Sequence, residues 1–190
     1  MPMQTTERLE KVQTQINPAS LENETLAFLF RYWNEKRGAR AMPSRADIKA
    51  SELRDHLGWV MIVEVMPDIS DFRYRLIGTL VTQYFLGDST GKTVKEIYGT
   101  SNPVAGKGVS AIFRKCARDK AVVHAFGEAG WIGEGFENFN CICLPLSDDG
   151  EHVNMILHAF VFDRSSVLMA REVARANGGQ LPAIGIRSSD

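Results

Sequence analysis

The chain has 190 residues, of which 44% are hydrophobic, and its formal net charge is −1. This length and composition are typical of one globular domain with additional helices. The near-neutral charge argues against a nucleic-acid-binding protein, which would neutralise many phosphates. No apolar run approaches the ~18 residues of a membrane span, and residues 1–16 lack the apolar core of a secretory signal. Three cysteines, Cys116, Cys141 and Cys143, cannot form a closed set of disulfides, so we expect a cytoplasmic protein.

The N-terminal region is predicted to be an arm followed by a helix. Residues 1–19 carry few apolar side chains, which indicates a mobile arm or a weak helix. A longer helix is expected over residues 21–37, where Gly38 ends it. Its apolar residues form two strips, one of Leu26, Leu29, Phe30 and Trp33 and the other of Phe28 and Tyr32. One strip can cover the domain, so the second predicts a homodimer through this helix.

A short helical segment and a β-hairpin are predicted next. Ser44 and Asp47 have the spacing of a variant capping box, and another short helix is expected over 52–57. The apolar run 59–66 predicts a buried strand. The alternating run 72–77 predicts a half-exposed strand, and a proline-containing turn joins the two into an antiparallel hairpin.

The second half is predicted to contain helices and then a meander of strands. Short helices are expected over 80–86, capped by Thr79, and over 92–98, and a long amphipathic helix over 104–118. The strands that follow are expected at 121–127, 137–146 and 152–162. The last strand is apolar on both faces, so both faces should be covered. Residues 166–190 are predicted to be a C-terminal helix with a loose tail.

Three short motifs occur in a fixed order along the chain. They are Tyr32-Trp33, the Pro-Ser-Arg-Ala-Asp-Ile run 43–48, and the Arg-Tyr-Arg-Leu-Ile-Gly-Thr run 73–79. This order resembles a bacterial family of stand-alone PAS-like domains over residues 20–165. The resemblance implies an α+β fold, a curled, five-stranded antiparallel sheet with short helices on one face and the N-terminal helix on the other. It also implies a sensory or regulatory module that signals through a separate partner protein.

A cavity between the curled sheet and its helices would be the candidate ligand site. The residues expected to line it are Tyr74, Leu76, Phe85, Phe113, Cys116, Phe126, His158 and Phe160. His158 is either a buried, hydrogen-bonded core residue or the polar anchor for a small, mostly apolar ligand. Arg75 is expected to pair with a carboxylate, either in the Asp47 turn or on a ligand.

No metal or prosthetic group is expected. The helix over 104–118 has no histidine for haem, and the helix after Gly78 has no cysteine for a flavin adduct. Cys141 and Cys143 share a strand face, but no second ligand pair is visible, which favours small buried cysteines over a zinc site. The run Gly87–Thr93 is one residue short of a phosphate-binding loop and is interpreted as a turn.

Three hypotheses on function remain open. The chain is a ligand-binding sensor, a ligand-free interaction and dimerisation module, or a small enzyme with His158 as general base. An enzyme needs a second titratable group beside His158, and the sequence identifies none, so we expect no catalytic activity. Whether the cavity is open or filled distinguishes the first two hypotheses.

Overall fold

The computed structural model describes residues 11–13, 16, 21–130 and 137–162. The strands are β1 (Lys11–Gln13), β2 (Val60–Val65), β3 (Phe72–Ile77), β4 (Val123–Glu128), β5 (Asn138–Leu146) and β6 (Met155–Phe162). The helices are α1 (Glu24–Arg37), α2 (Ala50–Leu53), α3 (Thr79–Val81), α4 (Val94–Tyr98) and α5 (Pro103–Asp119). Short helical turns are η2 (Arg45–Asp47), η3 (Arg54–Trp59), η4 (Pro67–Ile69) and η5 (Thr82–Leu86). Most of the predicted N-terminal arm and the predicted C-terminal helix lie outside the described residues.

All the strands belong to one antiparallel sheet with the order β1-β4-β5-β6-β2-β3. Five of them are the predicted strands, so the expected curled sheet of an α+β fold is confirmed. The sixth strand, β1, contradicts the prediction of a mobile arm or weak helix at residues 11–13. Its backbone pairs with β4, with Val12 opposite Ala125, and so extends the edge of the sheet.

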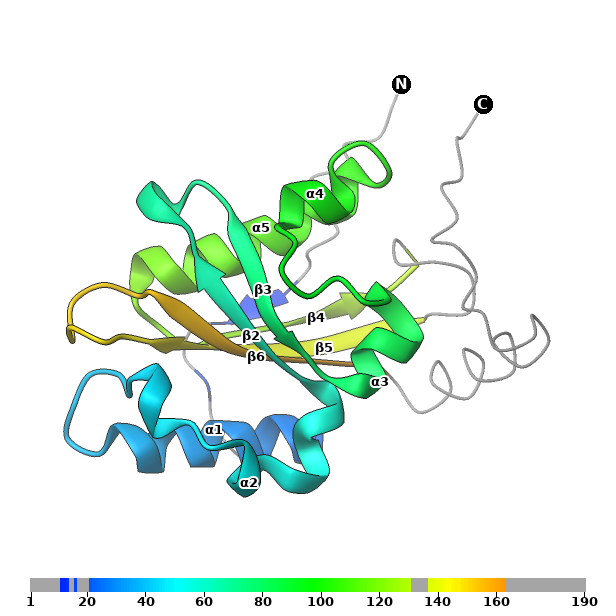
Figure 1. Cartoon of the computed structure of the whole chain (residues 1–190). Coiled ribbons are helices and arrows are strands. Elements are labelled where there is room, and N and C mark those ends of the chain that lie inside the picture. Colours follow the sequence, from blue (N-terminus) through cyan, green and yellow to red (C-terminus); the bar gives the residue numbers. More distant parts are fainter. Residues whose placement is uncertain (1–10, 14–15, 17–20, 131–136, 163–190) are drawn as a thin grey trace.

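Helices cover both faces of the sheet (Figure 1). Helix α5 packs on β4, β5 and β6 from one side, and α1 contacts β5 and β6 from the other. The short helical elements between Arg45 and Trp59 lie beside α1, and the short helix α4 packs on α5 at the opposite face, as predicted for the short helices. Within the described residues, no helix is both long enough and apolar enough to cross a membrane.

The central strand β6 is buried on both of its faces, as predicted. Its Leu157 and Ala159 face the α1 side, and His158 and Phe160 face the α5 side. All four side chains are at most 4% exposed, so no part of this strand face is open to bulk water.

Strand β3 contains a bulge that changes the predicted faces. Ile62 pairs with Leu76 and Val63 pairs with Tyr74, so Arg75 is an extra residue without a partner in β2. An extra residue breaks the two-residue alternation of side chains. Tyr74 therefore faces α5, whereas Leu76 faces the opposite side of the sheet, together with Ile62.

The ends of α1 are set by local chemistry. The side chain of Asn23 accepts hydrogen bonds from the backbone N–H groups of Thr25 and Leu26, so the helix begins at Glu24 instead of residue 21. Gly38 ends the helix with φ of 55°, a left-handed value that glycine adopts without strain, as predicted.

Candidate functional site

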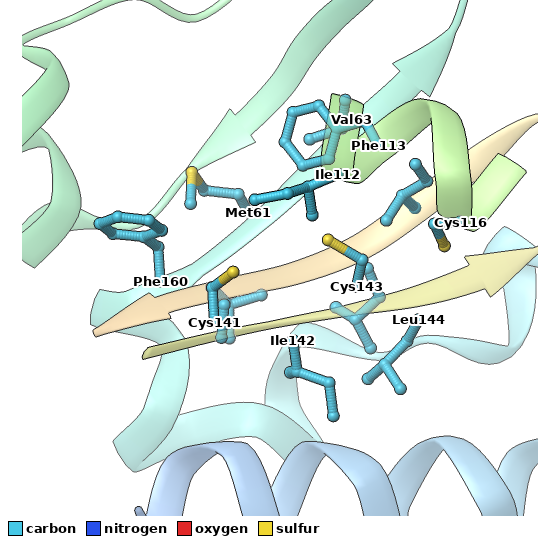
Figure 2. Close-up of a cluster of buried hydrophobic side chains, with 14 of the residues drawn as sticks. Met61, Val63, Ile112, Phe113, Cys116, Cys141, Ile142, Cys143, Leu144 and Phe160 are labelled. Carbon is cyan, nitrogen blue, oxygen red and sulfur yellow. The ribbon is translucent and has the colours of Figure 1, made fainter. Parts of the chain in front are cut away.

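The structure brings together five of the eight residues predicted to line a cavity. Tyr74, Phe113, Cys116, His158 and Phe160 all lie between α5 and the sheet. Figure 2 labels three of them, Phe113, Cys116 and Phe160. It also shows that Cys141 and Cys143 on β5 point to the α5 side, whereas Ile142 and Leu144 point away from it. We call this set of five residues the α5-side cluster.

The other three predicted residues are not part of the α5-side cluster. Leu76 lies on the opposite face because of the bulge at Arg75. Phe126 pairs with Asn140 and packs on His124, on the face opposite the one that Cys141 occupies. The assignment of these two residues to the His158 face is therefore wrong. The side chain of Phe85 lies outside the described side chains.

Phe113 fills the space between α5 and the sheet. Its ring centroid lies 5.4 Å from that of Phe72, 6.2 Å from that of Tyr74 and 5.0 Å from that of His158. The His158 ring meets it at 89°, edge to face, an arrangement that aromatic rings favour. Only 1% of the Phe113 surface is exposed. The position predicted to be the wall of a cavity is thus a contact between closely packed rings.

His158 is a neutral, hydrogen-bonded core residue. Its Nδ1 lies 2.9 Å from the carbonyl oxygen of Ile142, which can only accept, so Nδ1 carries the proton. The Sγ of Cys143 lies 3.3 Å from the same nitrogen. Burial lowers the pKa of His158 from 6.5 to about 4, although the hydrogen bond to Ile142 opposes the shift.

The buried thiols beside His158 are protonated and apolar in character. Burial raises the pKa of Cys116, and burial together with a hydrogen bond from the Cys143 thiol to Cys141 raises that of Cys143. All three cysteines are free thiols. His124 lies on the other face of the sheet from Cys141, and the described residues contain no group of three metal-binding side chains.

The buried state of His158 predicts a specific loss of stability in acid. Because its pKa is lower in the folded chain, protonation favours unfolding as the pH falls from about 6.5 to about 4. Above about pH 6.5 the neutral His158 makes its full contribution to the free energy of unfolding, and about 3 kcal/mol of it is lost as the pH falls to about 4. The variant His158→Met should have a flatter profile of unfolding free energy against pH, measured in urea. An unchanged slope would show that His158 is already accessible to protons.

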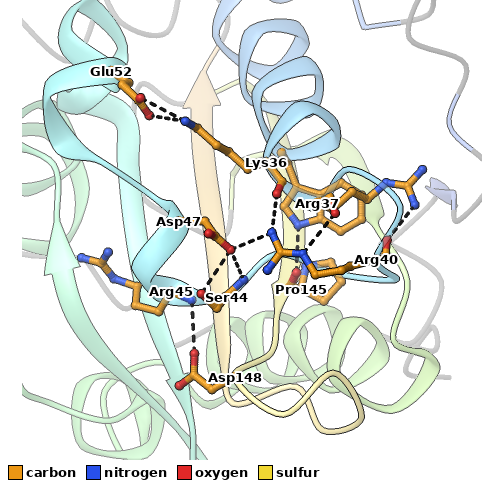
Figure 3. A network of polar contacts seen from close by, with 10 residues as sticks. Lys36, Arg37, Arg40, Ser44, Arg45, Asp47, Glu52, Pro145 and Asp148 are labelled. Carbon is orange, nitrogen blue, oxygen red and sulfur yellow. Dashed lines mark hydrogen bonds and ion pairs between the residues drawn. The ribbon is translucent and has the colours of Figure 1, made fainter.

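The first two sequence motifs fix the α1 layer to the sheet (Figure 3). The indole Nε1 of Trp33 donates a hydrogen bond of 2.8 Å to the carbonyl oxygen of Pro145 on β5. The backbone N–H of Ser147 donates to the carbonyl oxygen of Pro43, and that of Arg45 donates to Asp148. The residues that carry the resemblance therefore have structural roles at the end of the β5–β6 hairpin.

Removing the Trp33 hydrogen bond should destabilise the chain. Trp33→Phe leaves the buried carbonyl of Pro145 without its donor, and we expect the free energy of unfolding to fall by about 1–3 kcal/mol. Arg37→Ala on the same helix is the control, because its partly exposed guanidinium lies over the Trp33 ring and donates only to Asn34 and to the carbonyl oxygen of Arg40, so it should contribute about 1 kcal/mol or less. Equal losses in urea titrations of the two variants would contradict this role for the indole.

The second apolar strip of α1 is covered by its own chain. The hydroxyl of Tyr32 donates to Glu52 at 2.7 Å and accepts from the backbone N–H of Lys49 at 2.9 Å. Phe28 stacks on His56 with ring centroids 4.1 Å apart. The inference that this strip faces a partner subunit is therefore wrong, because segment 48–57 occupies it. A sequence pattern shows that a face is apolar but not which segment covers it.

Asp47 and Arg75 each have an ion-pair partner, but they do not pair with each other. Asp47 accepts hydrogen bonds from the backbone and side chain of Ser44 and lies 3.0 Å from the guanidinium of Arg40. The Ser44 backbone contact is the main cause of the lowered pKa of Asp47. Arg75 lies 2.9 Å from Glu64 on the neighbouring strand β2. The expected pairing of Arg75 with a carboxylate of the Asp47 turn is therefore wrong, because its partner is Glu64 on the neighbouring strand.

A small cavity lies on the face of the sheet opposite the α5-side cluster. It has a volume of about 20 Å³, which is room for about one water molecule. The residues that line it are Arg45, Ile48, Ala50, Leu53, Leu57, Val60, Ile62 and Leu76. Leu76 is the one predicted site residue among them. Arg45 belongs to the second sequence motif and could have been considered as a site residue. Leu76 could not be placed here from the sequence, because the bulge at Arg75 turns it to this face.

The run Gly87–Thr93 forms a turn along the edge of β3. The backbone N–H of Gly91 donates to the carbonyl oxygen of Tyr74, and that of Tyr74 donates to the carbonyl oxygen of Lys92. The first of these bonds uses the N–H group of Gly91, the kind of group that a phosphate-binding loop would offer to its ligand, in accordance with the interpretation as a turn.

An antiparallel curled sheet with helices packed on both faces and a long helix over its centre is the architecture of a sensory-domain fold. A protein-family model described as PAS domain matches residues 21–160. The match covers more than half of the chain, which therefore belongs to the PAS domain family. No curated protein matches the chain, and no solved structure matches it.

Proposed function

We propose that this chain is a regulatory PAS module without catalytic activity, which acts by contact with a separate protein. The observation that carries the proposal is the packing of Phe113 against Phe72, Tyr74 and His158. A sensor that binds its ligand under α5 needs space there, and these rings occupy it. The α5-side cluster then serves as structural core, and signalling depends on the surface of the module.

The chemistry of the α5-side cluster supports the absence of catalysis. His158 is neutral near pH 7, and the adjacent Cys143 is a protonated thiol. Both side chains are at most 4% exposed, so neither meets a substrate from solution. General acid–base work requires a group within reach of the proton that it transfers. We place the module in the bacterial cytoplasm, in keeping with its motifs and its three free thiols.

A homodimer through α1 belongs to this proposal, with a changed contact surface. Because Phe28 and Tyr32 are engaged within the chain, the contact would use the neighbouring half-buried Ala27 and Phe30 with exposed Arg31. Sedimentation of the full chain at tens of micromolar should give a dimer. A monomer at that concentration would remove the dimer from the proposal.

Methyl NMR with small apolar probes tests the packed interior directly. Benzene and indole should leave the methyl signals of Val63, Ile112 and Ile156 unchanged, because the rings of Phe72, Tyr74, Phe113 and His158 pack against one another under α5. Saturable shifts of these three methyl groups would show a ligand cavity and restore the sensor of a small, mostly apolar molecule as the leading hypothesis.

A further inference from the structure

The cavity beside Arg45 lies apart from the α5-side cluster, on the opposite face of the sheet. It is enclosed by segment 45–57 and by strands β2 and β3. Ala50 on its rim is exposed and Arg45 is half-buried, so the cavity opens to solvent on that side. Ile48, Leu53 and Ile62 are each at most 5% exposed and form its inner wall.

Arg45 lines the cavity, and its guanidinium has no ion-pair partner among the described residues. Its guanidinium donates one hydrogen bond, from Nη1 to the carbonyl oxygen of Ile48 at 3.0 Å. A guanidinium has five N–H donors, so most of its capacity remains. Within the described part of the chain, no carboxylate lies at ion-pair distance from it.

The nearest acidic side chains in the Arg45 network have other partners. Asp47 is held by Ser44 and Arg40. Asp148 accepts 2.7 Å from the side chain of Asn154 and meets only the backbone N–H of Arg45. Figure 3 shows the Arg45 side chain directed away from both carboxylates. The guanidinium is thus left to bind an anion from outside the described chain.

We propose that this site binds a short aliphatic monocarboxylate. The carboxylate pairs with the Arg45 guanidinium at the opening, in the bidentate geometry that this pair favours. The terminal methyl group enters the cavity, whose volume of about 20 Å³ suits a group of that size. A second negative charge would find no further cation on the apolar wall, which favours a monoanion over a dicarboxylate or phosphate. This site goes beyond the proposed protein contact and does not depend on it.

Butyrate is the probe for the test, and butyramide is its neutral control of the same shape. Butyrate should shift the methyl signals of Ile48, Ile62 and Leu76 in a saturable manner. Butyramide should bind about tenfold more weakly or not at all, because it lacks the charge-assisted hydrogen bonds. The methyl signals of Ile112 and Ile156 should not move, which separates this site from the α5-side cluster.

Two variants and a matched control complete the test. Arg45→Gln should weaken butyrate binding by about tenfold or more, whereas Arg54→Gln should not, since Arg54 is exposed and does not line the cavity. Ala50→Leu should block the opening of the cavity and weaken butyrate binding as well. This variant tests the site independently if Arg45→Gln fails to fold. Equal butyrate affinity in wild type and in either blocking variant would overturn the proposal. Equal affinity for butyramide, or no saturable shift at all, would overturn it as well.

Discussion

Phe113→Ala is expected to lower the free energy of unfolding by about 3–5 kcal/mol. The side chain is 1% exposed and packs against Phe72 and Tyr74 on β3 and against His158 on β6. Its removal takes away buried apolar surface and leaves a cavity that the surrounding sheet cannot close. Urea titration followed by tryptophan fluorescence measures the loss.

Val104→Ala on the same helix is the control for Phe113→Ala. Val104 is 54% exposed, so its truncation should change stability by about 0.5 kcal/mol or less. A loss of about 1 kcal/mol or less in Phe113→Ala would contradict a packed interior, because it would mean that Phe113 borders space that is already open.

Gly78→Ala should cost about 4 kcal/mol or more, or prevent folding. A Cβ at this position would overlap the backbone carbonyl oxygens of Leu57 and Gly58. Backbone atoms cannot rotate away as a side chain can, and the N–H of Gly78 is held 2.8 Å from the carbonyl oxygen of Val60. The glycine of the third motif therefore allows β3 to pass close to η3, just before α3 begins.

Gly130→Ala provides the comparison for Gly78→Ala. No atom lies within 4 Å of a Cβ at Gly130, so this change should leave stability unaltered or raise it by up to about 1 kcal/mol. Thermal unfolding by circular dichroism gives both values. If Gly78→Ala unfolds at the wild-type temperature, the close approach of the two backbone segments is absent in solution.

Five of the six strands of the described sheet, β2 to β6, could be predicted from the sequence because their signals are local. Two-residue alternation, turn residues and the continuous apolar run of β6 each depend on near neighbours. The burial of His158 could also be predicted, because it lies among apolar residues on a strand whose two faces are both covered. The bulge at Arg75 could not be predicted, because alternation along β3 looks the same with or without an extra residue opposite β2. One residue out of register moved Leu76 to another face.

Contacts between segments that are distant in the sequence also could not be predicted. The pattern of α1 predicted two apolar strips correctly but could not show that segment 48–57 folds back over Phe28 and Tyr32. In the same way, the sequence predicted that Arg75 pairs with a carboxylate but not which one. Its partner Glu64 lies close to it because β2 pairs with β3. The cavity beside Arg45 combines residues from five elements, η2, α2, η3, β2 and β3, so no single motif predicted it.

Native mass spectrometry of the purified chain and of its Arg45→Gln variant tests most directly whether the interior under α5 is filled. With a filled interior, Arg45→Gln should carry no small molecule, and anything bound to the wild-type chain should be a small acid that this variant loses. A molecule bound one per chain in both proteins would contradict this expectation, because the site beside Arg45 would not explain its retention in the variant.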